Sequence, residues 1–120
     1  MITKTKKLIN SFKYAFQGII TSFKTERNMK IHVFIMLLVI IFGFVFKLNP
    51  VEWMIIITMI VIVISAELFN TSIETVVDMI SPEKNEKAKV AKDVAAGAVL
   101  VLAIGSVIIG LIIFLPKIIK

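Results

Sequence analysis

The feature that most constrains this chain is a run of 22 residues, Val94–Leu115, without a single charged side chain. A helix needs about 20 consecutive apolar residues to cross the hydrocarbon core of a bilayer. Two further apolar runs precede it, at Ile31–Phe46 and from Trp53 to about Ala66. Because 58% of the 120 residues are also hydrophobic, the composition excludes a water-soluble domain and indicates a small integral membrane protein.

We therefore predict an all-α membrane protein with three transmembrane helices, in a single domain that covers residues 1–120. The second helix should continue past the membrane to residue 80, where Ser81-Pro82 stops it. Another helix should begin near Glu83 and continue into the third span, which Pro116 follows. Because three helices enclose little volume, we also expect the protein to form an oligomer. The spans are predicted at residues 31–48, 53–69 and 94–115.

Residues 4–24 are predicted to form an amphipathic surface helix. Apolar side chains recur there at offsets of three or four, and lysines and amides lie mostly on the other side, a pattern typical of a helix in the membrane interface. The polar segment Thr25–Lys30 is then expected to be a short hinge. His32 is the chain's only histidine and is expected to form interfacial hydrogen bonds rather than to bind a metal. The apolar positions of the helix are Leu8, Phe12, Phe16, Ile19 and Phe23.

The basic residues predict the orientation in the membrane. Seven precede the first apolar run and four lie between the second and third, whereas Lys47, Lys117 and Lys120 fall on the other side. The positive-inside rule therefore places the N-terminus and residues 78–93 in the cytoplasm. The net charge of +6 fits this topology and anionic lipid, so no nucleic-acid partner is expected. No cleavable signal peptide is expected, and the lack of cysteine excludes disulfides.

Four polar side chains on the second helix form the candidate site. Glu67, Asn70, Glu74 and Asp78 follow one another at offsets of three, four and four, which places them on one stripe of a helix. Carboxylates at the edge of a membrane span are costly, and they usually face a protein interior and serve a function. Glu67 should lie roughly 10 Å deeper than Glu74, at 1.5 Å per residue.

The residues near the predicted cytoplasmic face suit a metal and a phosphate. Glu74 and Glu26 offer hard oxygen ligands of the kind that bind Mg²⁺, which completes its shell with water and phosphate oxygens. Lys89 and Lys92 fall on one face beside Asp93. A lysine at the start of a helix can bind a phosphate as a point charge.

Glu67 is the candidate general base. Its depth in the membrane should disfavour its charged form, which suits proton abstraction from a hydroxyl presented by the bilayer. These parts indicate phosphoryl transfer from a nucleotide to a lipid alcohol, although the chain has no GxxxxGK[ST] loop. Two alternatives remain open: Glu67 and Glu74 could pair with lysines to fix helix packing, or Glu67 could bind the transported proton of a small proton-coupled transporter.

Two stretches carry a resemblance to a known family. Ala66–Asp78, AELFNTSIETVVD, and Ala91–Leu100, AKDVAAGAVL, closely resemble the signature of the bacterial diacylglycerol kinase family, approximately E-x-x-N-[ST]-A-I-E-x-x-V-D followed by A-K-D-x-[AG]-[AS]-[AG]-A-V. The similarity covers nearly the whole chain. It implies a homotrimeric lipid kinase whose active sites are shared between neighbouring subunits, with ATP and Mg²⁺ as the donor complex.

The resemblance also implies roles for residues at matching positions. Glu67 corresponds to the general base, with Asp93 as a rival, and Glu26 and Glu74 correspond to the metal-binding carboxylates. Ala96 stands where some relatives have Ser, at a position that meets the lipid hydroxyl together with Glu67. The positions that correspond to nucleotide contacts are Tyr14, Glu26, Asn70, Glu74, Asp78, Glu83, Lys84, Asn85, Lys92 and Asp93.

The branch of the family sets the expected acceptor. Glu26–His32 and Ala95–Ala98 resemble the undecaprenol kinase branch more than the diacylglycerol branch. The expected reaction is therefore ATP-dependent phosphorylation of undecaprenol to undecaprenyl phosphate, at the cytoplasmic face of a bacterial plasma membrane. Phosphorylation of diacylglycerol to phosphatidic acid is the alternative, and the proton-coupled transporter is the alternative from another class.

Overall fold

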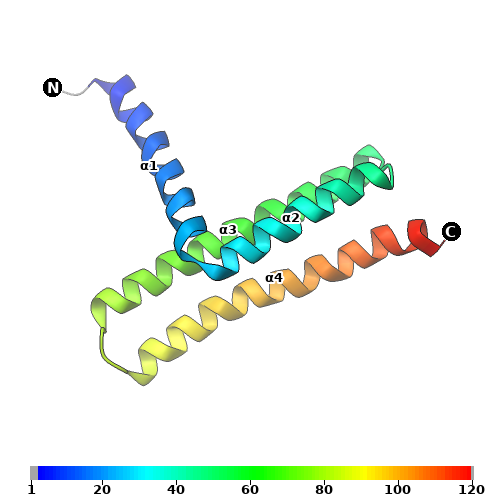
Figure 1. Cartoon of the computed structure of the whole chain (residues 1–120). Coiled ribbons are helices and arrows are strands. Elements are labelled where there is room, and N and C mark those ends of the chain that lie inside the picture. The colour runs from blue at the N-terminus through cyan, green and yellow to red at the C-terminus, as the bar shows by residue number, and fades with distance from the viewer. Residues whose placement is uncertain (1–2, 120) are drawn as a thin grey trace.

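The computed structural model describes residues 3–119, and helices account for almost all of this part. The all-α prediction is confirmed, and α2, α3 and α4 are long and apolar enough to cross a membrane. These three helices lie side by side, whereas α1 leaves them at a steep angle (Figure 1). The helix bounds are α1 Lys4–Thr25, α2 Arg27–Val45, α3 Pro50–Ile80 and α4 Glu86–Ile119.

Helices α1 and α2 are separated by one residue, Glu26. Its backbone is extended, with φ −105° and ψ 117°, and its N–H still bonds to the Ser22 carbonyl at the end of α1. The predicted hinge at Thr25–Lys30 was therefore wrong in extent. Residues 27–30 contain no glycine or proline, and Met29 is 2% exposed, so polar composition alone did not interrupt the helix.

The turn from α2 to α3 explains why α2 ends at Val45, before the predicted limit of residue 48. Lys47 has a φ of 54°, in the left-handed region. The Leu48 N–H donates to the Gly43 carbonyl at 3.0 Å, which is the C-terminal pattern that satisfies the last carbonyls of a helix. Directly after Leu48, Asn49 and Glu52 form a reciprocal capping box. The Glu52 N–H donates to Asn49 Oδ1 at 2.8 Å, and the Asn49 N–H donates to Glu52 Oε1 at 3.0 Å. Pro50 then opens α3.

The C-terminal end of α2, the N-terminal end of α3 and the C-terminal end of α4 pack together around this turn. Leu48, Ile56 and Ile113 form a buried apolar cluster, with Trp53 packed against it. Lys117 of α4 pairs with Glu52 of α3 at 3.1 Å. Helix α4 reaches this pair because it continues through Pro116 to Ile119, past the predicted span limit at Leu115. A proline removes one backbone hydrogen bond, and the last turn of a helix can lose it.

The opposite ends of α3 and α4 extend the bundle. At 1.5 Å per residue, the 31 residues of α3 are roughly 46 Å long, well beyond a hydrocarbon core of about 30 Å. Helix α3 ends at Ile80, as predicted. Helix α4 begins at Glu86 rather than near Glu83, because Asn85 caps it: the Asn85 side-chain oxygen accepts from the Lys87 N–H at 2.9 Å.

Apolar side chains cover the outside of the bundle. Phe44 and Phe69 are each 71% exposed and Ile112 is 68% exposed. Three of the buried residues in the described chain are polar instead: Ser22, Glu67 and Asn70. This inverted distribution is what lipid as the surrounding solvent favours, because only polar groups then need to be enclosed by protein.

Candidate functional site

Glu67 lies at the centre of the candidate site, on the inner face of α3. It is 1% exposed, and Asn70, one turn further along, is 3% exposed. Within residues 3–119, neither carboxylate oxygen of Glu67 nor the side-chain oxygen of Asn70 has a hydrogen-bond partner. Three buried oxygens without donors are costly, and they indicate a site built to meet a donor or a cation from outside.

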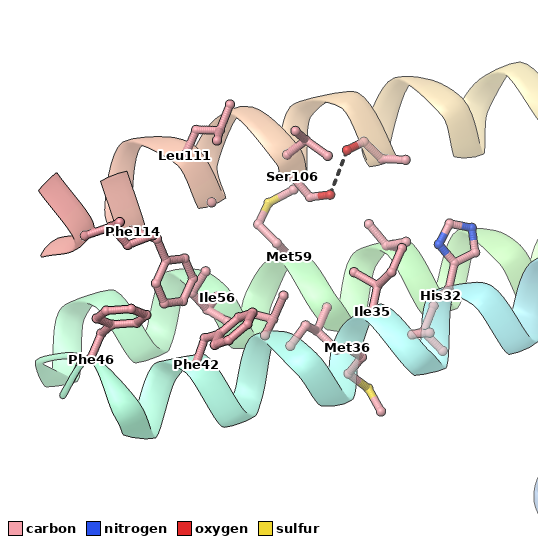
Figure 2. A pocket seen from close by; sticks show the side chains of 18 residues that line it. His32, Ile35, Met36, Phe42, Phe46, Ile56, Met59, Ser106, Leu111 and Phe114 are labelled. Carbon is pink, nitrogen blue, oxygen red and sulfur yellow. Dashed lines mark hydrogen bonds between the residues drawn. The ribbon is translucent and has the colours of Figure 1, made fainter. Parts of the chain in front are cut away.

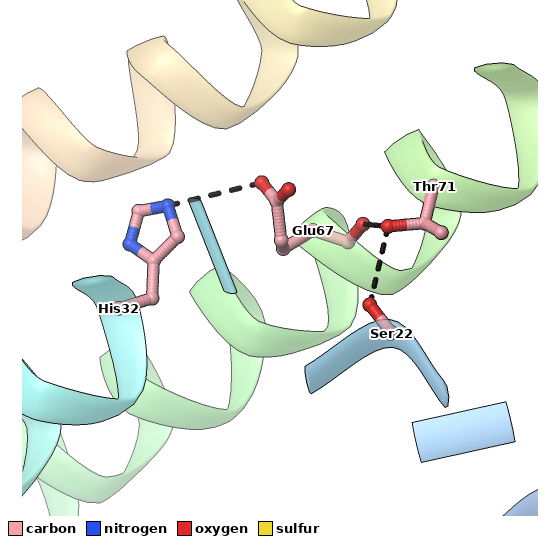
Figure 3. A network of polar contacts seen from close by, with 4 residues as sticks. All are labelled: Ser22, His32, Glu67 and Thr71. Atoms are coloured by element: carbon pink, nitrogen blue, oxygen red, sulfur yellow. Dashed lines mark hydrogen bonds and ion pairs between the residues drawn. The ribbon is translucent and has the colours of Figure 1, made fainter. Parts of the chain in front are cut away.

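His32 of α2 faces the Glu67 carboxylate across the gap between the helices (Figure 3). The distance from His32 Nε2 to Glu67 Oε2 is 3.8 Å. Its side chain is 16% exposed, so the imidazole is also largely enclosed. In the described chain, Glu67 pairs with no lysine, which removes support for the reading in which a lysine neutralises it to fix helix packing.

A hydroxyl pair connects α1 to the same segment of α3. Thr71 Oγ1 donates to the Glu67 carbonyl at 3.0 Å, and Ser22 Oγ lies 3.2 Å from Thr71 Oγ1 (Figure 3). Since the Thr71 proton is already used, Ser22 donates. Ser22 is 2% exposed. This contact fixes the end of α1, and with it Glu26, against the helix that carries Glu67.

The two predicted metal-binding carboxylates are both half-buried and belong to different segments. Glu26 is the residue between α1 and α2, and Glu74 lies two turns beyond Glu67 on α3. Within residues 3–119, no three metal-ligating side chains form a compact cluster. Two carboxylates still fit Mg²⁺, because this ion keeps several waters and phosphate oxygens in its shell.

The predicted nucleotide contacts Lys92 and Asp93 on α4 form ion pairs at the end of the bundle opposite the α2–α3 turn. Lys92 pairs with Asp78 of α3 at 2.5 Å rather than with its neighbour Asp93. Asp93 pairs with Lys89 at 2.7 Å, one helical turn away. The side chains of Asp93 and Asp78 are 62% and 61% exposed. Asp93 is therefore a solvated carboxylate beside a lysine, whereas Glu67 is enclosed and faces the imidazole of His32 at 3.8 Å. This contrast favours Glu67 as the candidate base.

The remaining predicted site residues do not gather around Glu67 within this chain. Tyr14 is 63% exposed on α1, on the arm that leaves the bundle. Glu83, Lys84 and Asn85 belong to the exposed α3–α4 connection, where Asn85 caps α4. Ala96 lies on an exposed part of α4.

An apolar groove begins at the same place as the site. It is a cavity of about 480 Å³ between α2, α3 and α4, and Figure 2 shows His32 at one end and Phe46 near the other. From His32 to Phe46 is 14 residues, roughly 21 Å along α2. Apart from His32 and Ser106, its lining side chains are apolar. Ser106 Oγ donates to the Ala103 carbonyl at 2.8 Å, so its polarity is satisfied internally.

Three residues that shape the site could not be assigned from the sequence. Ser22 and Thr71 carry no distinctive spacing, since hydroxyls are common on helices. His32 was identified as a hydrogen-bonding residue, but its partner was not. The sequence feature that bears on this partner is the short turn that joins α2 and α3 as antiparallel neighbours. Their register depends on where that turn begins, which is set by the left-handed Lys47 and not by any periodicity.

Comparisons with known proteins show the family of the chain. The family model for prokaryotic diacylglycerol kinase matches residues 13–114. The chain is 48% identical over 111 residues to undecaprenol kinase from Bacillus subtilis, covering 92% of this chain and 90% of that protein. It is 39% identical over 114 residues to a diacylglycerol kinase from Synechocystis, covering 94% of this chain and 65% of that protein. A diacylglycerol kinase from Haemophilus influenzae is 34% identical over 108 residues, covering 89% and 92%. The chain therefore belongs to the prokaryotic diacylglycerol kinase family.

Proposed function

We propose that this protein is a membrane-embedded kinase that transfers the γ-phosphoryl group of ATP to the hydroxyl of undecaprenol. The observation that carries the proposal is Glu67: a buried carboxylate, 1% exposed, whose two oxygens have no donor within the described chain. The 48% identity to the Bacillus undecaprenol kinase supports undecaprenol as the acceptor. The long apolar helices support a substrate that is itself a membrane lipid.

The groove explains how such an acceptor could reach Glu67. A polyprenol is an apolar chain with one terminal hydroxyl, and the groove is an apolar channel with a polar end at His32. Apolar walls bind a hydrocarbon chain without fixing its chemistry, and the few polar groups at one end orient it. The hydroxyl would then lie beside the unpartnered oxygens of Glu67.

The proton transfer follows from that arrangement. Glu67 accepts the proton of the lipid hydroxyl as the acceptor oxygen attacks the γ-phosphorus. The new oxygen–phosphorus bond forms while the bond from the γ-phosphorus to the leaving oxygen breaks, and the leaving electron pair stays on ADP. Little covalent chemistry is required of the protein, because positioning and charge stabilisation dominate phosphoryl transfer.

The nucleotide side of the site is formed by the helix extensions. Lys92, held by Asp78 between α3 and α4, places a positive charge where phosphates would lie. Glu26 and Glu74 would hold Mg²⁺. When bound, this ion neutralises phosphate charge as it develops during transfer. In the topology predicted from the basic residues, these groups open to the cytoplasm, where ATP is available.

A homotrimer would complete the site. Tyr14 and Ala96 are exposed in one chain, so they are available to a site to which another chain contributes. The arm formed by α1 projects away from its own bundle (Figure 1) and is free to reach a neighbouring subunit. The exposed apolar faces of α2–α4 supply the surface for such packing.

Diacylglycerol is the second candidate acceptor. The relatives from Synechocystis and Haemophilus influenzae, at 39% and 34% identity, are both diacylglycerol kinases. The same base and the same donor would serve either alcohol. Only the apolar part of the acceptor differs, and a groove with apolar walls separates two hydrocarbon chains weakly.

The first experiment measures phosphate transfer from labelled ATP, with Mg²⁺, to undecaprenol and to diacylglycerol in parallel, using the purified protein in mixed micelles. We expect strong labelling of undecaprenol and weak labelling of diacylglycerol. Glu67→Gln should reduce the rate by about 10²–10⁴-fold, the usual contribution of a general base. The oligomeric state of this variant should match that of the unaltered protein.

Each other result has a defined meaning. Preferential labelling of diacylglycerol would keep the mechanism and replace the acceptor. Full activity in Glu67→Gln would remove Glu67 as the base and favour Asp93. Failure to label either lipid, from protein of verified oligomeric state, would refute the kinase. The proton-coupled transporter would then be tested by flux into liposomes under a pH gradient without ATP.

A further inference from the structure

His32 is the protein group placed to orient Glu67. Nε2 of the imidazole lies 3.8 Å from Glu67 Oε2, and the ring points at the carboxylate from the neighbouring helix (Figure 3). The gap exceeds a direct hydrogen bond by about 1 Å, which a small side-chain rotation removes. Within residues 3–119, no other charged side chain forms an ion pair with Glu67.

The position of His32 also links two features that are otherwise separate. The same imidazole lines the polar end of the apolar groove, so it lies where an acceptor hydroxyl would meet Glu67. At 16% exposure it is screened from bulk water, and a hydrogen bond formed there competes poorly with solvent. A donor in this place would fix one carboxylate oxygen and leave the other free.

We propose that His32 is a positioning residue: its Nε2–H donates to Glu67 Oε2, so that Glu67 Oε1 points at the hydroxyl of the lipid acceptor. This inference rests on the proposed function. During transfer the hydroxyl proton moves to Oε1, and the imidazole stays neutral and keeps its own proton. His32 therefore contributes orientation and no proton, and its loss should affect the rate of the chemical step more than the binding of ATP.

Three substitutions test the position of the donor. In His32→Gln the amide nitrogen reaches about as far as Nε2, so a donor to Glu67 is kept. In His32→Asn the amide nitrogen reaches only as far as Nδ1, and in His32→Leu there is no donor. We expect His32→Gln to retain most of kcat, and the Asn and Leu variants to lose about 10²-fold, the usual effect of a misplaced reacting group. KM for ATP should stay unchanged in all three.

The contrast between Gln and Asn separates positioning from packing. Both side chains are polar amides, and they differ in the reach of the donor. Equal losses in His32→Gln and His32→Asn would overturn the proposal, and so would full kcat in His32→Leu. A loss that appeared in KM for ATP rather than in kcat would overturn it as well.

A measurement that needs no turnover tests the pair itself. Because His32 is the only histidine, nitrogen-15 NMR of the imidazole in detergent micelles reports this one side chain. Glu67→Gln should shift the Nε2 resonance, whereas Glu86→Gln, a change at the exposed start of α4, should leave it in place. An Nε2 signal unaffected by Glu67→Gln would overturn the pairing.

The two experiments fail in different ways. If the unaltered protein phosphorylates neither lipid, the proposed function is refuted, while the NMR comparison still decides whether His32 donates to Glu67. If the protein is an active kinase and His32→Leu keeps full kcat, the positioning role alone is refuted.

Discussion

At the scale of single residues, burying Glu67 costs folding free energy, and its proposed role as a general base explains why such a residue is present. A buried polar atom without a hydrogen-bond partner costs about 1–3 kcal/mol, and Glu67 brings two such atoms into a bundle that is otherwise apolar. Glu52, at the start of the same helix, has donors instead: its Oε1 lies 3.1 Å from Lys117 Nζ and accepts from the Asn49 N–H at 3.0 Å. Of these two glutamates, Glu52 caps α3 and pairs with α4, whereas Glu67 is the one that we propose to react.

Glu74 carries the prediction for the metal. Glu74→Gln removes one of the two charges proposed to hold Mg²⁺ and keeps the size of the side chain. Because Mg²⁺ is bound by so few protein ligands, losing one should raise the Mg²⁺ concentration needed for half-maximal rate, by about tenfold for each 1.4 kcal/mol lost. A Mg²⁺ titration of the kinase reaction measures this.

The matched control for the metal is Glu86→Gln. Glu86 is an exposed carboxylate in the first turn of α4, so its removal changes net charge equally without touching the proposed ligands. Its Mg²⁺ titration should overlay that of the unaltered protein. Identical curves for Glu74→Gln and Glu86→Gln would remove Glu74 from the metal site.

At the scale of helices, one close approach fixes how α2 and α3 pack. A Cβ added at Gly43 would lie 2.5 Å from the Trp53 ring. The Trp53 ring is in turn held by Phe44, with ring centroids 4.9 Å apart, and by the buried cluster. The glycine thus lets the ring of α3 pack directly on the backbone of α2, one turn before the chain reverses.

Gly43→Ala should therefore destabilise the protein although alanine is the better helix former. Forcing the Trp53 ring away costs about 1–3 kcal/mol, as overpacking does elsewhere. In Gly105→Ala, where nothing lies within 4 Å of the added methyl group, the substitution should be neutral or slightly stabilising. Thermal unfolding in the same detergent, followed by circular dichroism, compares the two. A Gly43→Ala variant as stable as Gly105→Ala would show that the ring moves freely.

Features that depend on local sequence, such as helix ends and the stripe of polar residues on α3, could be predicted. Contacts that depend on how two helices are aligned with each other could not. The 3.6-residue period was enough to place Glu67 and Asn70 on one stripe, and Ser81-Pro82 was enough to end α3. The extent of the break between α1 and α2 was misjudged, because a mostly polar segment without glycine or proline can continue a helix, as residues 27–30 do. The facing of His32 and Glu67 could not be predicted, since it depends on the register of two neighbouring helices, which the turn between them sets.

At the scale of the whole molecule, the arrangement divides into a membrane part and an extension. The Leu48 cluster, Trp53 and the Glu52–Lys117 pair lie at one end of the bundle. The ion pairs of Lys89 and Lys92 lie at the other end, where α3 and α4 continue beyond a hydrocarbon thickness. Glu67 lies on α3 between these two ends, where we propose that a lipid hydroxyl and a nucleotide meet.

The orientation of this arrangement can be tested with single cysteines, because the chain has none of its own. Lys87→Cys lies in the first turn of α4 and should face the cytoplasm. Lys47→Cys lies in the α2–α3 turn and should face outward. A membrane-impermeant maleimide applied to intact cells should label position 47 and not position 87, and permeabilised cells should show both. The reverse labelling pattern would contradict the predicted topology.

The groove that ends at His32 determines which concentration of the acceptor governs the reaction rate. ATP would arrive by diffusion through a volume, but an acceptor that enters along an apolar groove arrives by diffusion within a surface. Its effective concentration is then a mole fraction of the membrane and not an amount per litre. Adding inert lipid at constant total acceptor should slow the reaction by dilution in two dimensions, while the dependence on ATP stays the same.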